Sequence, residues 1–102
     1  MNVGEYGIAF NLNVGYDISG NSALSLVFTR PDASTFTATK PAVSVGNTPI
    51  STTSGPFAAN QYSVYLFKDG DLTVPGTYGV RLQYTDATKH LVSDPVTFTV
   101  NL

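Results

Sequence analysis

Three side chains near the C-terminus are of the types that form a catalytic triad: His90, the single histidine of the chain, Ser93 and Asp94. In a triad the histidine takes the proton of the serine nucleophile and a carboxylate orients the histidine, whatever their order in the sequence. The Gly-x-Ser-x-Gly turn that exposes such a serine in many hydrolases does not occur in the sequence. Because His90 begins a predicted strand, we expect an ordinary surface histidine and no catalytic residues.

Asp69 and Asp71 flank Gly70 and could together contact a cation. A calcium loop needs more oxygen ligands in register and a more distant Glu, and the sequence lacks that pattern. A glycosidase with paired carboxylates is also not expected in a domain with a single Glu. Aspartates in turn sequences usually bond to nearby backbone. The sequence therefore predicts turn aspartates, with no metal and no cofactor, and leaves adventitious calcium binding as the alternative.

The composition of this 102-residue chain, which has the length of one domain, argues against several other classes of function. A net charge of -2 argues against nucleic-acid binding. The absence of Cys excludes disulfides, a thiol nucleophile and cysteine-based zinc sites. No glycine-rich phosphate loop occurs. Charged residues make up 12% of the chain, about half of the roughly 25% of an average soluble domain.

The elements that must position these side chains are strands. Apolar and polar residues alternate with a period of two, and apolar residues show no helical repeat. Turn signals recur at roughly the 8–12-residue spacing of a β-sandwich. The expected strands, counted as seven or eight in a single domain, cover residues 6–14, 24–29, 35–39 with a continuation at 42–45, 50–53, 61–67, 77–85, 91–92 and 96–100.

The N-terminal sequence from Met1 to Tyr6 has neither a basic region nor an apolar run of signal-peptide length, so we expect no secretion signal. No stretch approaches the roughly 18 consecutive apolar residues of a membrane-spanning helix. We therefore expect a protein made and assembled in the cytoplasm, with no membrane partner.

The segment from Asp71 to Val80 resembles the corner between strands E and F of an immunoglobulin-like sandwich. In that corner a Tyr at the start of strand F bonds through its hydroxyl to upstream backbone. Tyr78 fits this role, and Gly76 stands two residues before it. Antibody domains carry Cys where this chain has Val80, and a Trp in the third strand, whereas this chain has no Trp. The resemblance implies a broadly immunoglobulin-like antiparallel β-sandwich with Gly76 and Tyr78 as a structural corner; the alternative is a plain turn entering a strand.

A narrower resemblance links the chain to small immunoglobulin-like modules of tailed-bacteriophage tail and baseplate proteins. Those modules often carry a Phe-x-x-Pro-Asp-Gly turn and a late Pro-Gly-x-Tyr-x-Val-x-Leu strand. This chain has the first pattern at residues 28–33, with Ala33 where Gly is common, and the second at residues 75–82. The resemblance implies a virion protein that assembles inside the host and leaves by lysis.

Residues 41–67 carry no charge, and the strand expected at 61–67 is apolar on both faces. If Tyr62, Val64 and Leu66 face the core, then Tyr65 and Phe67 face outward. Exposed apolar patches usually mark protein contacts, and interface cores are poor in charge. We therefore expect a contact surface for another virion subunit or a second copy of the chain, with these candidate residues: Ile50, Phe57, Tyr65 and Phe67. The alternative is that residues 46–60 fold over the sheet and cover Tyr65 and Phe67.

Together these observations predict a non-enzymatic structural protein of a bacteriophage virion, placed in the tail or the head–tail region. Its partners would be other virion proteins or copies of itself. A capsid decoration protein is one alternative, distinguished by hundreds of copies per particle. A carbohydrate-binding module for host attachment is the other, since aromatic residues can stack on sugars; it implies a weak glycan contact.

Overall fold

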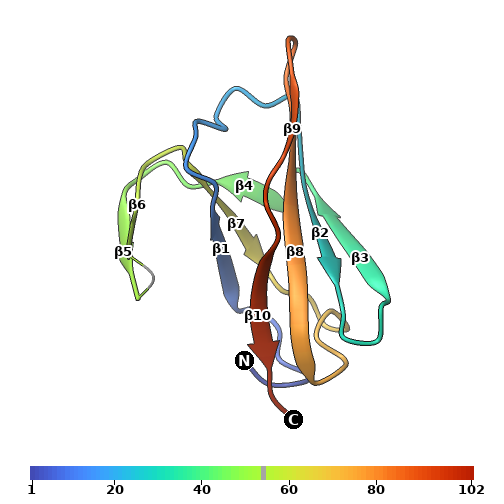
Figure 1. Ribbon diagram of the computed structural model, residues 1–102. Coiled ribbons are helices and arrows are strands. Elements are labelled where there is room, and N and C mark those ends of the chain that lie inside the picture. Colours follow the sequence, from blue (N-terminus) through green and yellow to red (C-terminus); the bar gives the residue numbers. More distant parts are fainter. Residues whose placement is uncertain (54) are drawn as a thin grey trace.

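Alternating apolar residues produce two facing antiparallel sheets in the computed structural model, which describes residues 1–53 and 55–102 (Figure 1). The described residues form ten strands and no helix. The strands are β1 (Ala9–Asn13), β2 (Ala23–Thr29), β3 (Thr35–Thr39), β4 (Val43–Val45), β5 (Ile50–Thr52), β6 (Gly55–Phe57), β7 (Tyr62–Leu66), β8 (Gly76–Thr85), β9 (His90–Val92) and β10 (Val96–Val100). The prediction of an all-β sandwich is confirmed.

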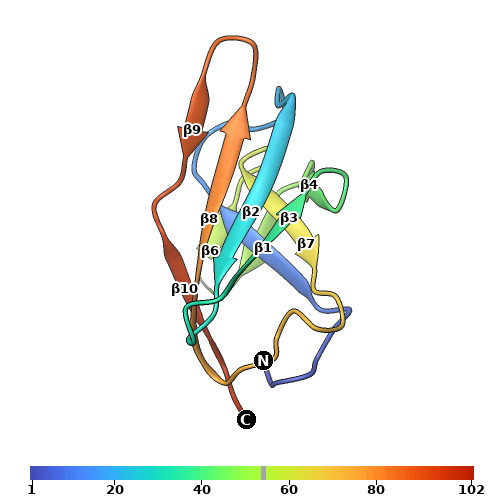
Figure 2. The ribbon, with the colours of Figure 1, turned by 90° about the vertical axis from the view of Figure 1, so that its right-hand side faces the viewer.

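The strand order identifies which positions of an immunoglobulin-like sandwich are filled. One sheet has the order β1-β7-β4; the other has the order β10-β8-β2-β3, with β9 also paired to β8. Figure 2 shows β1 and β7 crossing behind the five-stranded sheet. In the immunoglobulin scheme these sheets correspond to strands B-E-D and G-F-C-C′. No strand of the described residues takes the place of strand A, which in that scheme lies next to strand B.

The structure has more strands than the predicted seven or eight because the run expected at 35–45 is divided into β3 and β4 and because β6 was not expected. Gly7, at φ 77°, adopts a conformation that side chains rarely allow, so the first strand begins at Ala9. The Ser-Gly-Pro sequence at 54–56 predicts the end of the strand expected at 50–53, but Gly55–Phe57 form β6 and pair with β5 in a separate hairpin. Ser54 lies outside the described residues.

An aromatic cluster fills the space between the sheets. Phe28 is fully buried, and its ring centroid lies 4.6 Å from that of Phe36 and 5.7 Å from that of Phe10. Phe98 of β10 joins the cluster, with its ring centroid 5.1 Å from that of Phe10. Aromatic pairs at these separations add stabilisation beyond the burial of their area. Strands from both sheets thus meet at one core.

The predicted orientation of β7 is wrong. Tyr65 and Phe67 are buried in the core, only 3% and 2% exposed, whereas Leu66 is 55% exposed. A strand that is apolar on both faces gives no periodic signal for choosing between them. Phe67 faces the aromatic cluster, with its ring centroid 5.6 Å from that of Phe28, and the Tyr65 hydroxyl reaches a carboxylate at the end of the sandwich. Tyr65 and Phe67 therefore belong to the core and form no contact surface.

Candidate functional site

The two sequence patterns that suggested an immunoglobulin-like module meet at one end of the sandwich, here called the motif end: residues 28–34 and 68–78. The Tyr78 hydroxyl donates to the carbonyl oxygen of Val74 at 2.7 Å and accepts from its N–H at 3.2 Å. Tyr78 thus makes the bond to upstream backbone that the E–F corner requires. Gly76 has φ 131°, and a Cβ there would lie 2.8 Å from Cγ of Pro31. A glycine is therefore needed where the two segments touch.

Arg30 and Asp71 fasten the motif end further. The Arg30 side chain donates to the backbone oxygen of Asp71 at 3.1 Å and to that of Gly70 at 3.2 Å, and its guanidinium lies 4.5 Å from the centre of the Phe36 ring. The Asp71 carboxylate accepts from the Tyr65 hydroxyl at 2.5 Å. Burial, and secondarily this carboxylate, raises the pKa of Tyr65. Asp71 therefore stabilises the turn. Among the described residues, no group of three His, Asp or Glu side chains could hold a metal ion.

Other aspartates bond to their own turns. Side-chain hydrogen bonds from Ser19 and Ser34 lower the pKa of Asp17 and Asp32, respectively. Asp86 accepts from the Tyr84 hydroxyl at 2.6 Å and from backbone N–H groups of its turn. These bonds, the Tyr84 hydroxyl first, hold the pKa of Asp86 well below its usual range. The three carboxylates thus stabilise local turns.

His90, Ser93 and Asp94 make separate contacts. The His90 ring bonds through Nδ1 to the Thr85 hydroxyl at 2.8 Å. The Ser93 hydroxyl accepts from the backbone N–H of Leu82 at 2.9 Å and donates to the backbone oxygen of Asp94 at 3.1 Å. These bonds join neighbouring strands and are not the serine–histidine–carboxylate chain of a triad.

The four predicted contact residues do not form one surface. Ile50 and Phe57 are half-buried and face each other across the β5–β6 hairpin, which stands beside the sandwich in Figure 1. Phe57 packs on Tyr62, with ring centroids 5.7 Å apart, and the Tyr62 hydroxyl donates to the backbone oxygen of Thr48 at 2.8 Å. The sequence alternative, in which residues 46–60 cover Tyr65 and Phe67, is not seen either, because Thr48 and Phe57 of that segment contact Tyr62 instead.

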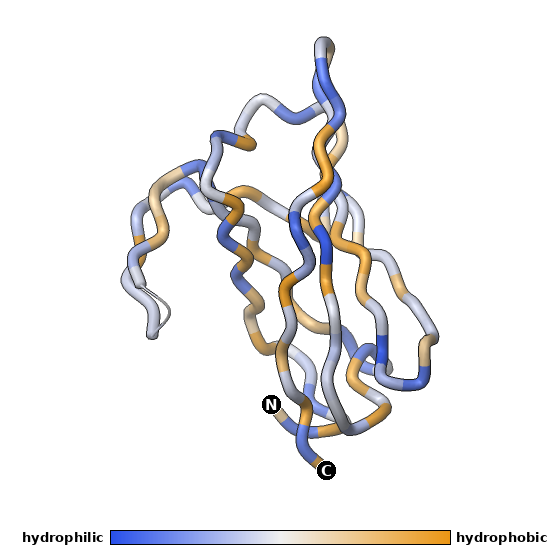
Figure 3. The backbone as a smooth tube through the Cα atoms, in the orientation of Figure 1, coloured by the Kyte–Doolittle hydropathy of each residue, from blue (hydrophilic) through white to orange (hydrophobic). Residues whose placement is uncertain are grey.

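A depression of about 390 Å³ lies beside β1 and is here called the edge groove. It runs along β1 and is bounded by β10 on one side and by Phe57 of the hairpin on the other. Its lining residues, all uncharged, are Phe10, Asn11, Leu12, Asn13, Phe57, Val96, Thr97 and Phe98. A neighbouring hollow of about 280 Å³ shares Asn13 and Val96 with it and extends the depression toward Tyr16 and Asp94. In Figure 3 the β5–β6 hairpin is coloured from white to orange, without the deep blue of the charged turns.

Backbone groups of β1 also face the edge groove. Phe67 donates its N–H to the Ile8 oxygen at 3.0 Å, and Val14 donates to the Gln61 oxygen at 2.9 Å. In an antiparallel pair the bonding direction alternates along each strand. Even-numbered residues of β1 therefore bond to β7, whereas the N–H and C=O groups of Ala9, Asn11 and Asn13 point away from it. The groove thus combines apolar side chains with an open strand edge.

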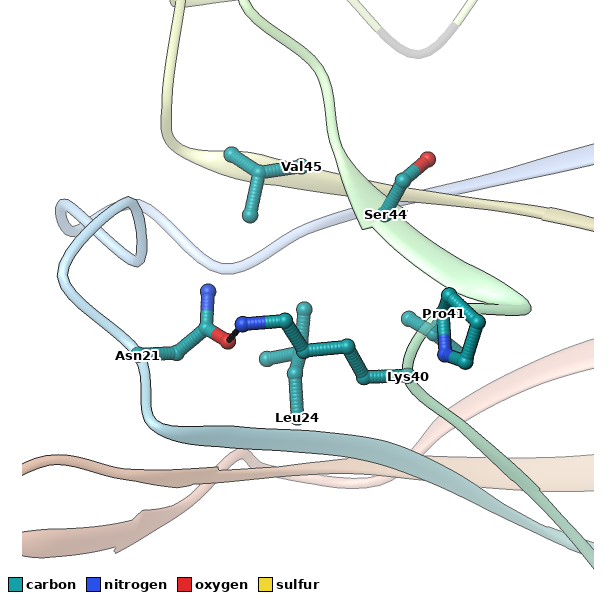
Figure 4. A pocket seen from close by; sticks show the side chains of 7 residues that line it. Asn21, Leu24, Lys40, Pro41, Ser44 and Val45 are labelled. Atoms are coloured by element: carbon teal, nitrogen blue, oxygen red, sulfur yellow. Dashed lines mark hydrogen bonds between the residues drawn. The ribbon is translucent and has the colours of Figure 1, made fainter.

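The opposite side of the sandwich is closed by the chain itself. A hollow of about 260 Å³ lies there, where residues 40–42 cross from β3 to β4 (Figure 4). The Lys40 side chain reaches across it and donates to the Asn21 amide oxygen at 3.1 Å. Lys40 and Asn21, on opposite sides of this hollow, therefore bond to each other. On the β1 side, the N-terminal segment passes from the end of β10, where Val3 donates to the Asn101 oxygen, to the end of β7, where Gly7 donates to the Phe67 oxygen. No strand of the described residues pairs with the outer edge of β1.

The β1 and β10 residues of the edge groove were not predicted as contact residues. One signal was present: β1 lies in an uncharged stretch between Glu5 and Asp17, and β10 lies in another that follows Asp94. Both stretches are shorter than residues 41–67, the uncharged stretch in which a contact surface was predicted. Only pairing of the strands shows that the two shorter stretches and Phe57 meet.

Comparison with protein-family models, with curated proteins and with solved structures gave no match for this chain. Nor does the described part of the chain contain a helix long and apolar enough to cross a membrane.

Proposed function

We propose that the protein is a non-enzymatic structural module of a bacteriophage virion, located in the tail or head–tail region, which acts by contact with other virion proteins. The observation that carries the contact role is the edge groove, an uncharged depression along an open strand edge with three phenylalanines in its lining. Interface cores are depleted in charge and enriched in aromatic residues. Phe57, predicted as a contact residue, is one of its walls.

The engagement of the chemically active side chains supports the non-enzymatic part of the proposal. Asp71 and Asp86 accept hydrogen bonds from tyrosines, and His90 and Ser93 bond within the β8–β9 region. General acid–base chemistry needs a group that is free to exchange a proton with a substrate. These groups instead stabilise turns and strand pairs.

The phage assignment depends on the resemblance of residues 28–33 and 75–82 to tail modules, and the contact between these two segments agrees with it. Pro31 packs against Gly76. Ala33, at the position where such turns commonly have Gly, has φ 70°. Ala33 therefore has the backbone conformation that favours the glycine found at this position in such modules.

The proposal is tested by quantitative mass spectrometry of particles purified from a host lysate that carries this gene. We expect the chain in the particles, at from a few up to several dozen copies. Hundreds of copies would indicate a decoration protein instead, and absence from particles would overturn the virion assignment. Binding of the isolated monomer to a glycan array would favour a host-attachment module.

A further inference from the structure

We propose that the edge groove accepts an extended segment of another protein chain, which pairs with β1 as an added strand and takes the empty place of strand A. The inference deepens the proposed function, because it names the form of the contact. It rests on three features of the groove: its unpaired backbone, its apolar walls and its unprotected edge.

The unpaired backbone requires a strand as occupant. Ala9, Asn11 and Asn13 present N–H and C=O groups away from β7 at alternate positions, as the flanking bonds at Ile8 and Val14 show. An extended segment presents its own N–H and C=O groups at every second residue, so it can form hydrogen bonds with all of these groups, as in other cases of recognition by strand addition. A compact ligand would reach only part of this row.

The walls of the groove determine which side chains the added strand must carry. Phe10 and Leu12 lie on its floor together with Phe98, whose ring centroid is 5.1 Å from that of Phe10. Side chains of a strand alternate between its two faces, so every second residue of the incoming segment would cover this floor. None of the eight lining residues is charged. The complementary segment is therefore uncharged, with large apolar residues at alternate positions.

The edge of β1 lacks the features with which proteins usually protect exposed strands. Charged residues, prolines, bulges or very short strands commonly prevent pairing there. The β1 sequence Ala-Phe-Asn-Leu-Asn contains no charge and no proline. The edge strand β4 has only three residues, and β3 is followed directly by Lys40 and Pro41. The edge of β1 is thus open to pairing, and it borders the groove.

The β5–β6 hairpin favours a single strand over a second copy of the domain. Phe57 forms the wall opposite β10, so the β1 edge lies at the bottom of a depression. A complete sandwich approaching this edge would meet the hairpin first, whereas an extended segment fits between Phe57 and β10. We therefore commit to a segment of a different chain as occupant.

The first residues of the chain indicate the direction of the added strand. Asn2 forms a parallel bridge with Asn101 beyond the end of β10, and Val3 donates to the Asn101 oxygen at 2.8 Å. The chain then turns away at Gly4, which has φ 86°. An occupant on the same track would run parallel to β10 and antiparallel to β1, as strand A does relative to strand B.

The experiment selects ligands for the isolated domain from a displayed library of random twelve-residue peptides, then adds the best peptide to the labelled domain. We expect enriched peptides that are uncharged and apolar at alternate positions. In amide hydrogen exchange, Ala9, Asn11 and Asn13 should exchange quickly in the free domain and become at least about tenfold slower with peptide bound. Failure to enrich peptides, or protection at other residues only, would overturn the proposal.

Matched proline substitutions test the site. Asn11→Pro removes an outward N–H from β1, a change that edge strands tolerate, and should weaken peptide binding by at least about tenfold. Thr37→Pro is the control: the bond from Lys40 N–H to the Leu24 oxygen places the Thr37 N–H on the free edge of β3. We expect this variant to bind peptide normally, and equal losses in both variants would contradict the site.

A second variant keeps the test decisive if Asn11→Pro unfolds. Phe57→Ser removes a groove wall outside the main core and should weaken peptide binding by about fivefold or more, with thermal unfolding as the check on folding.

A dimer of the free domain that Asn11→Pro abolishes would instead show pairing with a second copy, and would overturn the choice of occupant. If particles contain the protein but no peptide binds, strand addition is wrong and the proposed virion function stands. If peptides bind but particles lack the protein, strand addition stands and the virion function is wrong.

Discussion

The motif end and the edge groove of the same sandwich are built on opposite principles. At the motif end the polar side chains form hydrogen bonds with nearby backbone and side chains, as Tyr78, Arg30 and Asp71 do, and Pro31 lies against Gly76. Along the groove, alternate backbone groups of β1 have no strand beside them, and the lining carries no charge. The recognisable sequence patterns therefore mark the part of the fold that is fixed, whereas the part suited to contact has no pattern of its own.

The largest effect should come from replacing the glycine at the motif end. Gly76→Ala places a Cβ 2.8 Å from Pro31 at φ 131°, and strain and overpacking together should cost about 2–4 kcal/mol of unfolding free energy. Urea denaturation measures the loss. Gly79→Ala is the control in the same strand, because a Cβ at Gly79 would meet nothing within 4 Å. Equal costs at both positions would remove the basis for calling the motif end fixed.

A smaller loss is expected from removing a single hydroxyl there. Tyr78→Phe keeps the buried ring but deletes the bonds to Val74, so the free energy of unfolding should fall by about 1–3 kcal/mol. Tyr6→Phe, at a side chain that is 64% exposed, should change it little. Hydrogen exchange at Ala9 and Asn11 in the folded state should stay the same in both variants. Altered exchange at β1 would show that the two regions are coupled.

How far the sequence predicts this molecule depends on the kind of contact. Alternation and turn residues predicted the strands and the sandwich, and a local pattern pointed to Tyr78. The orientation of β7 was missed because both of its faces are apolar, and packing of Phe67 against Phe28 decided it. Long-range pairing has no local signature, so the gathering of β1, β10 and Phe57 around one groove could not be predicted.

The turn at the motif end offers a gain in stability. Ala33 has φ 70°, where a side chain is strained and Gly is not, so Ala33→Gly should raise the free energy of unfolding by about 0.5–1 kcal/mol. Thermal unfolding measures the shift. Ala87→Gly is the control in another turn, since Ala87 is not among the residues with positive φ, and it should be neutral or destabilising. A gain in both variants would point to a general effect of glycine in turns.

Removing the Tyr84–Asp86 hydrogen bond, at the β8–β9 end of the sandwich, should have the smallest effect on the free energy of unfolding at neutral pH. The effect should depend clearly on pH in alkali. The bond to Asp86, with burial second, raises the pKa of Tyr84 from about 10 to about 12. A raised pKa means that the bond stabilises the fold fully below pH 10 and that this contribution is lost as the pH rises through 12. Urea unfolding from pH 8 to pH 12 should therefore show wild type losing its advantage over Tyr84→Phe across that interval. A constant difference would contradict the bond.

The response to pH distinguishes the edge groove from the two ends of the sandwich. Hydroxyl–carboxylate bonds fix both ends of the sandwich, at Tyr65–Asp71 and at Tyr84–Asp86, and such bonds fail when the tyrosine loses its proton. The edge groove is lined only by side chains that do not ionise. Peptide binding there should stay constant from pH 6 to pH 9, because no lining residue changes charge. A pH-dependent affinity in that range would show that an ionisable group outside this lining takes part in binding.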